Sequence, residues 1–290
     1  MMIQNGTVNL QDGVRFEVSD DSCEYIIDET WSKKVYDVSD RIKENFIIID
    51  IGAHIGVFAV YAAKKAGRGK VYAYEPNPAS FALLEKNVKI NNLNNVIMSN
   101  LGVTKTRGDA VLFSNDTSIL CSMYVKCGKP IPMKTTTLQD IFDVNNITEC
   151  HFIKIDAEGA EYDILYPLPE KYFKKINFIS LEYHNFFPKN QLKKLVKLLN
   201  NRGFRIAKLI PDIYSRNVGI LCAERETRNK NQKFNNFLKY HSLGVVLLML
   251  IISSKTKKIV LEINKYIGKI GIFLKKYYPR IYFAIKKIKK

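Results

Sequence analysis

The chain has 290 residues, of which 47% are hydrophobic and 25% charged, as in an ordinary globular protein. This length allows one large domain, or one domain with an appendage. None of the five cysteines forms a C-x-x-C pair, which argues against a zinc site or a dithiol redox site.

The net charge of +17 is unevenly distributed along the chain. From Arg228 to Lys290 there are 16 basic residues and one acidic residue, which leaves 29 basic and 27 acidic residues upstream. The body is therefore nearly neutral and the tail strongly basic. We predict three parts: a β-rich preface (1–45), a main domain (46–227) and a basic helical tail (228–290).

The preface reads as two short strands, Val14 to Val18 and Tyr25 to Ile27, followed by a helix or loop from Trp31 to Val38. Such a segment either packs as a β-hairpin on the domain edge, or caps the cofactor pocket or contacts substrate. The first residues, MMIQNGTVNLQDG, have neither the basic nor the apolar region of a secretory signal. Together with the widely spaced cysteines, this indicates a reducing, cytoplasmic location.

The segment Phe46 to Ala63 predicts a buried strand, a glycine turn and a helix. Asp50 stands at the strand end, and Gly52 and Gly56 allow close approach to a ligand. A dinucleotide site has a second glycine where this chain has His54. The Asp50 carboxylate suits the ammonium group of S-adenosylmethionine (SAM), so the pattern is typical of SAM methyltransferases. A βα turn without a ligand is the alternative.

A second strand, Lys70 to Glu75, also ends in an acid, 25 residues after Asp50. An acid at this point of a βαβ unit binds ribose hydroxyls, although it can also cap the next helix. The pair Asp50 and Glu75 therefore favours the cofactor interpretation.

The chain then continues as a helix from Pro78 to Ile90 and a short strand from Val96 to Met98. Asn100 follows that strand, where it either hydrogen-bonds an adenine or shapes a turn. Residues 103–137 predict a strand and a hairpin or lid loop, and Thr135 to Phe142 a capped helix.

The next strand, His151 to Ile155, ends in Asp156, and we expect Glu158 to lie in the first turn of the following helix. Ligands bind beyond the carboxyl ends of strands in open α/β sheets, so Asp156 and Glu158 should line the pocket. Helix capping alone would explain Glu158, but not the acids together with Lys154 in the strand before them.

Another strand, Phe178 to His184, places Glu182 and His184 on one face at the same sheet edge. An amphipathic helix from Gln191 to Asn201 and the strands Gly203 to Leu209 and Val218 to Ala223 complete an α/β, Rossmann-like doubly wound sheet.

Taken together, the runs DIGAHIG, YEPNP, IKIDAEGAEYDIL and LEYH resemble the FkbM-type methyltransferase family over roughly residues 40–223. The resemblance implies a SAM-dependent enzyme that methylates hydroxyl groups of sugars, glycolipids or related metabolites. It assigns SAM binding to Asp50, Gly52, Gly56 and Glu75, beside His54 and Asn100. It also places the acceptor among Asp156, Glu158 and His184. From its place on the strand, Glu182 is a further candidate to orient the base or to bind acceptor hydroxyls. Either His184 or Asp156 is the candidate base. No metal ligands are assigned, although the carboxylate cluster leaves a divalent metal ion open as an alternative.

The tail contains an apolar run, Leu243 to Ile252, that is too short to span a bilayer. From Ile259 to Tyr277 an apolar stripe faces lysines, which is typical of a helix at an anionic membrane surface. The alternative is a helical subdomain packed on protein. A nucleic-acid enzyme using the tail remains a rival function, although the alternation of bases with Ile and Leu does not favour a nucleic-acid partner. We therefore expect a cytoplasmic enzyme that attaches peripherally to the inner membrane face.

Overall fold

The computed structural model describes residues 2–226 apart from positions 5, 11, 21, 37–40, 115–120, 123–127, 185–190 and 213–216. They belong to one compact unit, Met1–Arg228. The predicted helical tail, with its apolar run and its amphipathic stripe, lies outside the described residues.

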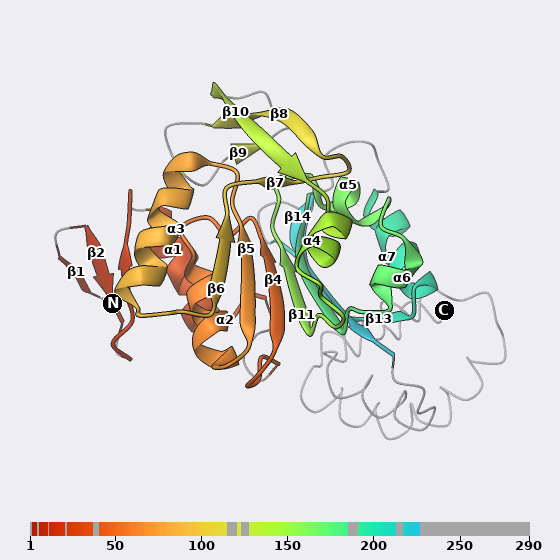
Figure 1. Cartoon of the computed structure of the whole chain (residues 1–290), viewed down its shortest axis with the longest axis horizontal. Helices are drawn as coiled ribbons and strands as arrows, with labels where there is room; N and C mark the ends of the chain where they lie inside the picture. The colour runs from red at the N-terminus through yellow and green to blue at the C-terminus, as the bar shows by residue number, and fades with distance from the viewer. Residues whose placement is uncertain are drawn as a thin grey trace, which may run out of the picture. The chain divides into compact units, whose positions relative to one another are not determined.

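A seven-stranded sheet forms the centre of this unit, in the order β13-β14-β12-β11-β4-β5-β6 (Figure 1). Six strands are parallel, and β14 alone runs antiparallel to its neighbours β12 and β13. The fold is thus the predicted Rossmann-like α/β class, with a mixed sheet. The strands are β4 (Ile47–Ile51), β5 (Lys70–Tyr74), β6 (Val96–Ser99), β11 (Phe152–Ile155), β12 (Phe178–His184), β13 (Phe204–Pro211) and β14 (Val218–Arg225).

Helices cover both faces of this sheet, and each face has its own hydrophobic core (Figure 1). On one face lie α2 (Val57–Ala66) and α3 (Pro78–Ile90). On the other lie α4 (Leu138–Val144), α5 (Glu161–Leu165), α6 (Glu170–Phe173) and α7 (Gln191–Asn201). The central strands are buried on both sides, which explains why they read as continuous apolar runs.

The preface is β-rich at its start, but it is not built as predicted. Strands β1 (Met2–Gln4), β2 (Thr7–Asn9) and β3 (Arg15–Glu17) form a small antiparallel sheet. The second predicted strand, Tyr25 to Ile27, is wrong, because these residues belong to α1 (Ser22–Asp28). Cys23 and Ile27, four residues apart, are both fully buried while Tyr25 is 55% exposed, which is helical spacing. A π-helical turn, η1 (Glu29–Lys33), follows α1.

A second small sheet lies beside the carboxyl ends of β5 and β6, at the top of Figure 1. It contains the predicted hairpin, formed by β8 (Gly108–Ser114) and β10 (Lys129–Thr136), with β7 (Gly102–Val103) and β9 (Cys121–Ser122). The helix predicted from Thr135 begins later, at α4. Thr137 caps it through a reciprocal hydrogen-bond pair with Asp140, so the two preceding threonines extend β10 instead.

Candidate functional site

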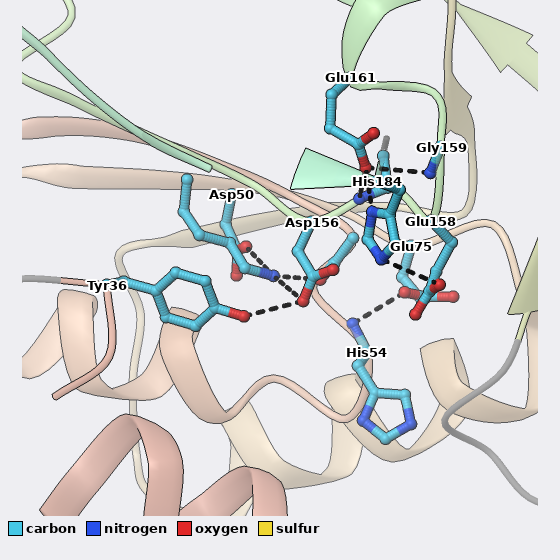
Figure 2. A network of polar contacts seen from close by, with 12 residues as sticks. Tyr36, Asp50, His54, Glu75, Asp156, Glu158, Gly159, Glu161 and His184 are labelled. Carbon is cyan, nitrogen blue, oxygen red and sulfur yellow. Dashed lines mark hydrogen bonds and ion pairs between the residues drawn. The ribbon is translucent and has the colours of Figure 1, made fainter. Parts of the chain in front are cut away.

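Four parallel strands bring their carboxyl ends together at one edge of the sheet. Asp50 lies near the end of β4, Glu75 directly follows β5, Asp156 directly follows β11, and His184 ends β12. Figure 2 shows these side chains in one polar network. The sequence predicted that they would gather at this edge, where open α/β sheets bind ligands.

The glycine turn after β4 approaches the end of β11 very closely. Gly52 has φ +72°, and a Cβ atom placed there would lie 1.7 Å from the carbonyl oxygen of Asp156. Gly56 has φ +87°, and its Cβ would lie 2.5 Å from Leu84 of α3. His54 is also left-handed, with φ 51°, although it carries a side chain. At Gly52 a side chain would collide with backbone, whereas at Gly56 the positive φ favours glycine and Leu84 would have to move, so the turn is built for close packing.

The Asp50 side chain is fully buried, and neither carboxylate oxygen accepts a hydrogen bond from the described residues. The Lys154 ammonium lies 3.5 Å from Oδ1. Burial raises the pKa of Asp50 to about 6, against the opposing effect of Lys154. Apart from this ion pair the described residues give the buried carboxylate no donor, so it can accept from a ligand that donates, such as the ammonium group of SAM.

The Glu75 carboxylate joins the second strand to the glycine turn. Its oxygens accept the backbone N–H groups of His54 and Asn77, each at 2.8 Å. Burial raises the pKa of Glu75 to about 7. The Asn100 side chain donates to the backbone carbonyls of Glu75 (2.8 Å) and Pro76 (3.1 Å). Asn100 thus supports the chain at Glu75, and its contact with adenine stays a prediction.

The Lys154 side chain links the glycine turn to Asp156. Its ammonium donates to the Gly52 carbonyl at 2.6 Å and lies 3.5 Å from Oδ2 of Asp156. Burial acts to lower the pKa of Lys154, but the surrounding carboxylates, Asp50 and Asp156 first, raise it above its ordinary value. Lys154 therefore stays cationic and offsets part of the negative charge at this edge.

The Asp156 carboxylate has two further partners. The hydroxyl of Tyr36 donates to its Oδ2 at 2.8 Å, and the Glu182 carboxyl is hydrogen-bonded to it. Burial acts to raise the pKa of Asp156, yet Lys154 and the other partners lower it. Burial and the Asp156 charge raise the pKa of Glu182 to about 9. No sequence pattern marked Tyr36 itself, although the preface was expected as one alternative to cap the pocket or contact substrate.

The His184 ring lies between two glutamates. Its Nδ1 is 3.0 Å from Glu161, and its Nε2 is 3.4 Å from Glu158. Burial acts to lower the pKa of His184, but Glu161, Glu158 and Asp156 raise it to about 10. Burial and the neighbouring Asp156 raise the pKa of Glu158 to about 7.

The loop before α5 corrects one prediction. Glu158 and Gly159 do not open the helix, because both have positive φ (49° and 107°) and α5 begins at Glu161. The fully buried Glu161 accepts the N–H groups of Ala157 (3.2 Å) and Gly159 (3.0 Å). This reach back into the loop turns Glu158 toward His184, as Figure 2 shows.

The network therefore joins the buried acids Asp50 and Glu75 on one side to Asp156, Glu158 and His184 on the other, with Lys154 between Asp50 and Asp156. Within the described residues, no group of three or more His, Cys, Asp or Glu side chains has an arrangement that would hold a metal ion. In the same part of the chain, no helix has both the length and the apolar character needed to cross a bilayer.

Comparison with known proteins agrees with this geometry. The model of the methyltransferase FkbM domain matches residues 50–206. Methyltransferase 1 of Beauveria bassiana is 26% identical over 211 residues, 65% of this chain and 84% of its own length. The hexuronic acid methyltransferase AglP of Haloferax volcanii is 24% identical over 157 residues (54% and 64%). The 31-O-demethyl-FK506 methyltransferase FkbM of Streptomyces tacrolimicus is 22% identical over 197 residues (57% and 75%).

The family model spans more than half of the chain, from Asp50 in the first core strand to Ile206 in β13. The matched segment includes the glycine turn, Glu75, Asp156, Glu158 and His184. The chain belongs to the FkbM family of SAM-dependent methyltransferases.

Proposed function

We propose that the enzyme moves a methyl group from SAM to a hydroxyl of a sugar, a glycolipid or a related metabolite. The main support is the juxtaposition of Asp50 and Glu75 with the Asp156–Glu158–His184 cluster at one sheet edge. Carboxylates suit an acceptor rich in hydroxyl groups, because they accept several hydrogen bonds. Two relatives are named for a hexuronic acid and for a demethylated FK506, which agrees with this acceptor class.

On the cofactor side, Asp50 would bind the ammonium group of SAM and Glu75 its ribose hydroxyls. When bound, SAM supplies an electrophilic methyl group on its sulfonium. The glycine turn would bring its backbone close to the cofactor, with Gly52, His54 and Gly56 in left-handed conformations. Lys154 holds this turn through the Gly52 carbonyl, so its position is fixed by residues on β11.

On the acceptor side, Glu158 is the group best suited to take the hydroxyl proton. Its pKa of about 7 is close to the working pH, where a general base is most effective. His184 stays protonated at neutral pH, since its pKa is raised to about 10, and so it orients Glu158. Asp156 is ionised and would accept a hydrogen bond from an acceptor hydroxyl. This choice differs from the bases that the sequence suggested, His184 and Asp156.

Calorimetry with SAM tests the cofactor half. Asp50→Asn and Glu75→Gln should weaken SAM binding at least about tenfold, which is the loss of about 1.4 kcal/mol expected for a hydrogen bond to a charged group. The matched control is Asp109→Asn, because Asp109 is an exposed acid paired with Lys134. Unchanged affinity in both site variants would contradict the assignment.

Turnover tests the acceptor half. Glu158→Gln should keep SAM affinity within about twofold and lower kcat about 100-fold or more, the usual effect of losing a general base. Glu170→Gln is the control, since Glu170 is an exposed acid that pairs with Lys174. A Glu158→Gln enzyme with the wild-type rate would show that another group takes the proton.

For the tail, we propose attachment to an anionic membrane surface. The proposal rests on the sequence alone: 16 of the 45 basic residues and one acid lie after position 227. Basic residues near such a surface contribute about 1 kcal/mol each. Full-length protein should co-sediment with vesicles containing acidic lipid at low salt and dissociate at high salt. A full-length protein that ignores such vesicles at low salt would refute it, and salt-dependent RNA binding would favour the nucleic-acid alternative.

A further inference from the structure

The N-terminal preface places one side chain inside the site. Tyr36 follows η1, whose end is marked by Lys34 in a left-handed conformation (φ 52°). The N–H of Val35 donates to the carbonyl of Glu29 at 3.1 Å, which closes the turn before Tyr36. Tyr36 is only 8% exposed, although it lies before the segment that the family model matches.

Aromatic contacts hold this preface against α2, the helix that follows the glycine turn. Trp31 packs edge-on against Tyr61 at 5.2 Å between ring centroids and against Phe16 at 5.8 Å. Tyr36 packs edge-on against Phe58 of α2 at 5.9 Å. These aromatic pairs hold Tyr36 in place on α2 and so position its hydroxyl in the site.

The Tyr36 hydroxyl meets the Lys154–Asp156 pair. It donates to Oδ2 of Asp156 at 2.8 Å, the same oxygen that lies 3.5 Å from the Lys154 ammonium. That ammonium also lies 5.2 Å from the centre of the Tyr36 ring. Figure 2 shows Tyr36 reaching Asp156 from the side opposite His184. Tyr36 thus contacts both members of the ion pair, one through its hydroxyl and one through its ring.

We infer that Tyr36 is a positioning residue, which the preface contributes to the active site to fix the Asp156 carboxylate for acceptor binding. The inference rests on the proposed function in so far as Asp156 contacts the acceptor. Removing the hydroxyl takes away one of the donors to Asp156 and leaves the half-buried carboxylate less firmly held beside Lys154. The donor direction is unambiguous, because burial and the nearby carboxylates raise the pKa of Tyr36 well above 10.

The test compares Tyr36→Phe with Tyr172→Phe in the full-length chain. Tyr172 is the matched control, because it is also buried (1% exposed) and also donates to an aspartate, Asp143, at 2.6 and 2.8 Å. Asp143 belongs to α4 and not to the site. Carbon-13 NMR of aspartate-labelled protein gives the pKa of Asp156, with the resonance assigned from Asp156→Asn. Calorimetry gives SAM affinity, and steady-state kinetics give kcat and KM.

We expect Tyr36→Phe to raise the pKa of Asp156 by about one unit, because a donor to the charged form is lost. SAM affinity should stay within about twofold, while kcat falls about 10- to 100-fold through misplacement of the acceptor. Tyr172→Phe should change none of these. In an Asp156→Asn background, Tyr36→Phe should have little further effect on kcat, since both changes act through one contact.

An unchanged Asp156 pKa together with an unchanged kcat would overturn the inference. So would equal losses in the single and double variants, because Tyr36 would then act independently of Asp156. Failure of the proposed function would look different: the wild-type enzyme would methylate no hydroxyl acceptor, while the NMR shift of Asp156 in Tyr36→Phe would still appear.

Discussion

The glycine turn gives the sharpest prediction about stability. In Gly52→Ala, the new methyl group would lie 1.7 Å from the carbonyl oxygen of Asp156, on a backbone with φ +72°. The methyl group is attached directly to the backbone and meets a backbone carbonyl, so no flexible side chain can move aside. Either the turn or the end of β11 must shift by roughly 1.7 Å or more to reach an ordinary contact distance.

Two costs add together in this substitution. An L-residue in the left-handed region costs about 1–2 kcal/mol. The forced displacement adds strain at two hydrogen-bonded elements, which brings the total to about 3–5 kcal/mol, the range of severe single substitutions. For a domain of this size, each kcal/mol lowers Tm by about 2–4 °C. We therefore expect Gly52→Ala to lower Tm by about 10 °C or more and to abolish measurable SAM binding.

Gly13→Ala separates the two costs. Gly13 has φ +77°, close to that of Gly52, but a Cβ placed there would meet nothing within 4 Å. This variant should lose only the conformational part, about 1–2 kcal/mol. Thermal and urea unfolding of both variants give the comparison. If Gly52→Ala loses no more stability than Gly13→Ala, the close approach of the turn to β11 is not rigid and the reasoning fails.

Three further experiments test the polar network and the boundary of the folded unit. The carboxyl groups of the site have raised pKa values, from about 6 for Asp50 to about 9 for Glu182, so the native state binds more protons than the unfolded state. The free energy of unfolding, measured with urea, should therefore fall as pH rises from about 5 to 9. An increase of this free energy with pH would contradict the reasoning. Glu161→Gln should lower the pKa of His184 from about 10 toward its ordinary value in a histidine NMR titration, and an unchanged titration would contradict the pairing. A chain cut after Arg228 should fold and bind SAM. A chain cut after Ala223 should have a lower Tm, because it loses Glu224, which pairs with Arg41 and Arg205. Equal Tm values for the two chains would argue against a stabilising role of Glu224.

Most of the central fold could be predicted because its strands are buried on both faces. The segments Pro78–Ile90, Phe178–His184 and Gln191–Asn201 were predicted with the bounds that the structure shows. Proline at a helix start, continuous apolar runs and an apolar stripe at helical spacing mark these elements locally. Asp50 and Glu75 were also visible, since their positions follow from the strand ends.

The remaining features depend on distant contacts. Tyr25 to Ile27 has strand-like residues, but the helical spacing of Cys23 and Ile27 decides its structure, and three residues are too few to show a period. Tyr36 lies 120 residues from Asp156, so no local pattern indicates their hydrogen bond. Glu161 reads as an ordinary helix-start acid, yet its carboxylate reaches back into the loop and holds His184. The sequence signal for the role of Glu161 was the unusual density of acids around Gly159.

The place of β14 has a consequence for synthesis of the chain on the ribosome. This strand is the last of the sheet in sequence, but it lies between β12 and β13. Until it emerges, the nascent chain presents β12, with His184 at its end, as an open edge that can pair with other chains. The cofactor half of the site, on β4 and β5, can assemble much earlier during translation. The acceptor half is therefore the last to mature, and chaperone protection should matter most while residues 185–217 are emerging.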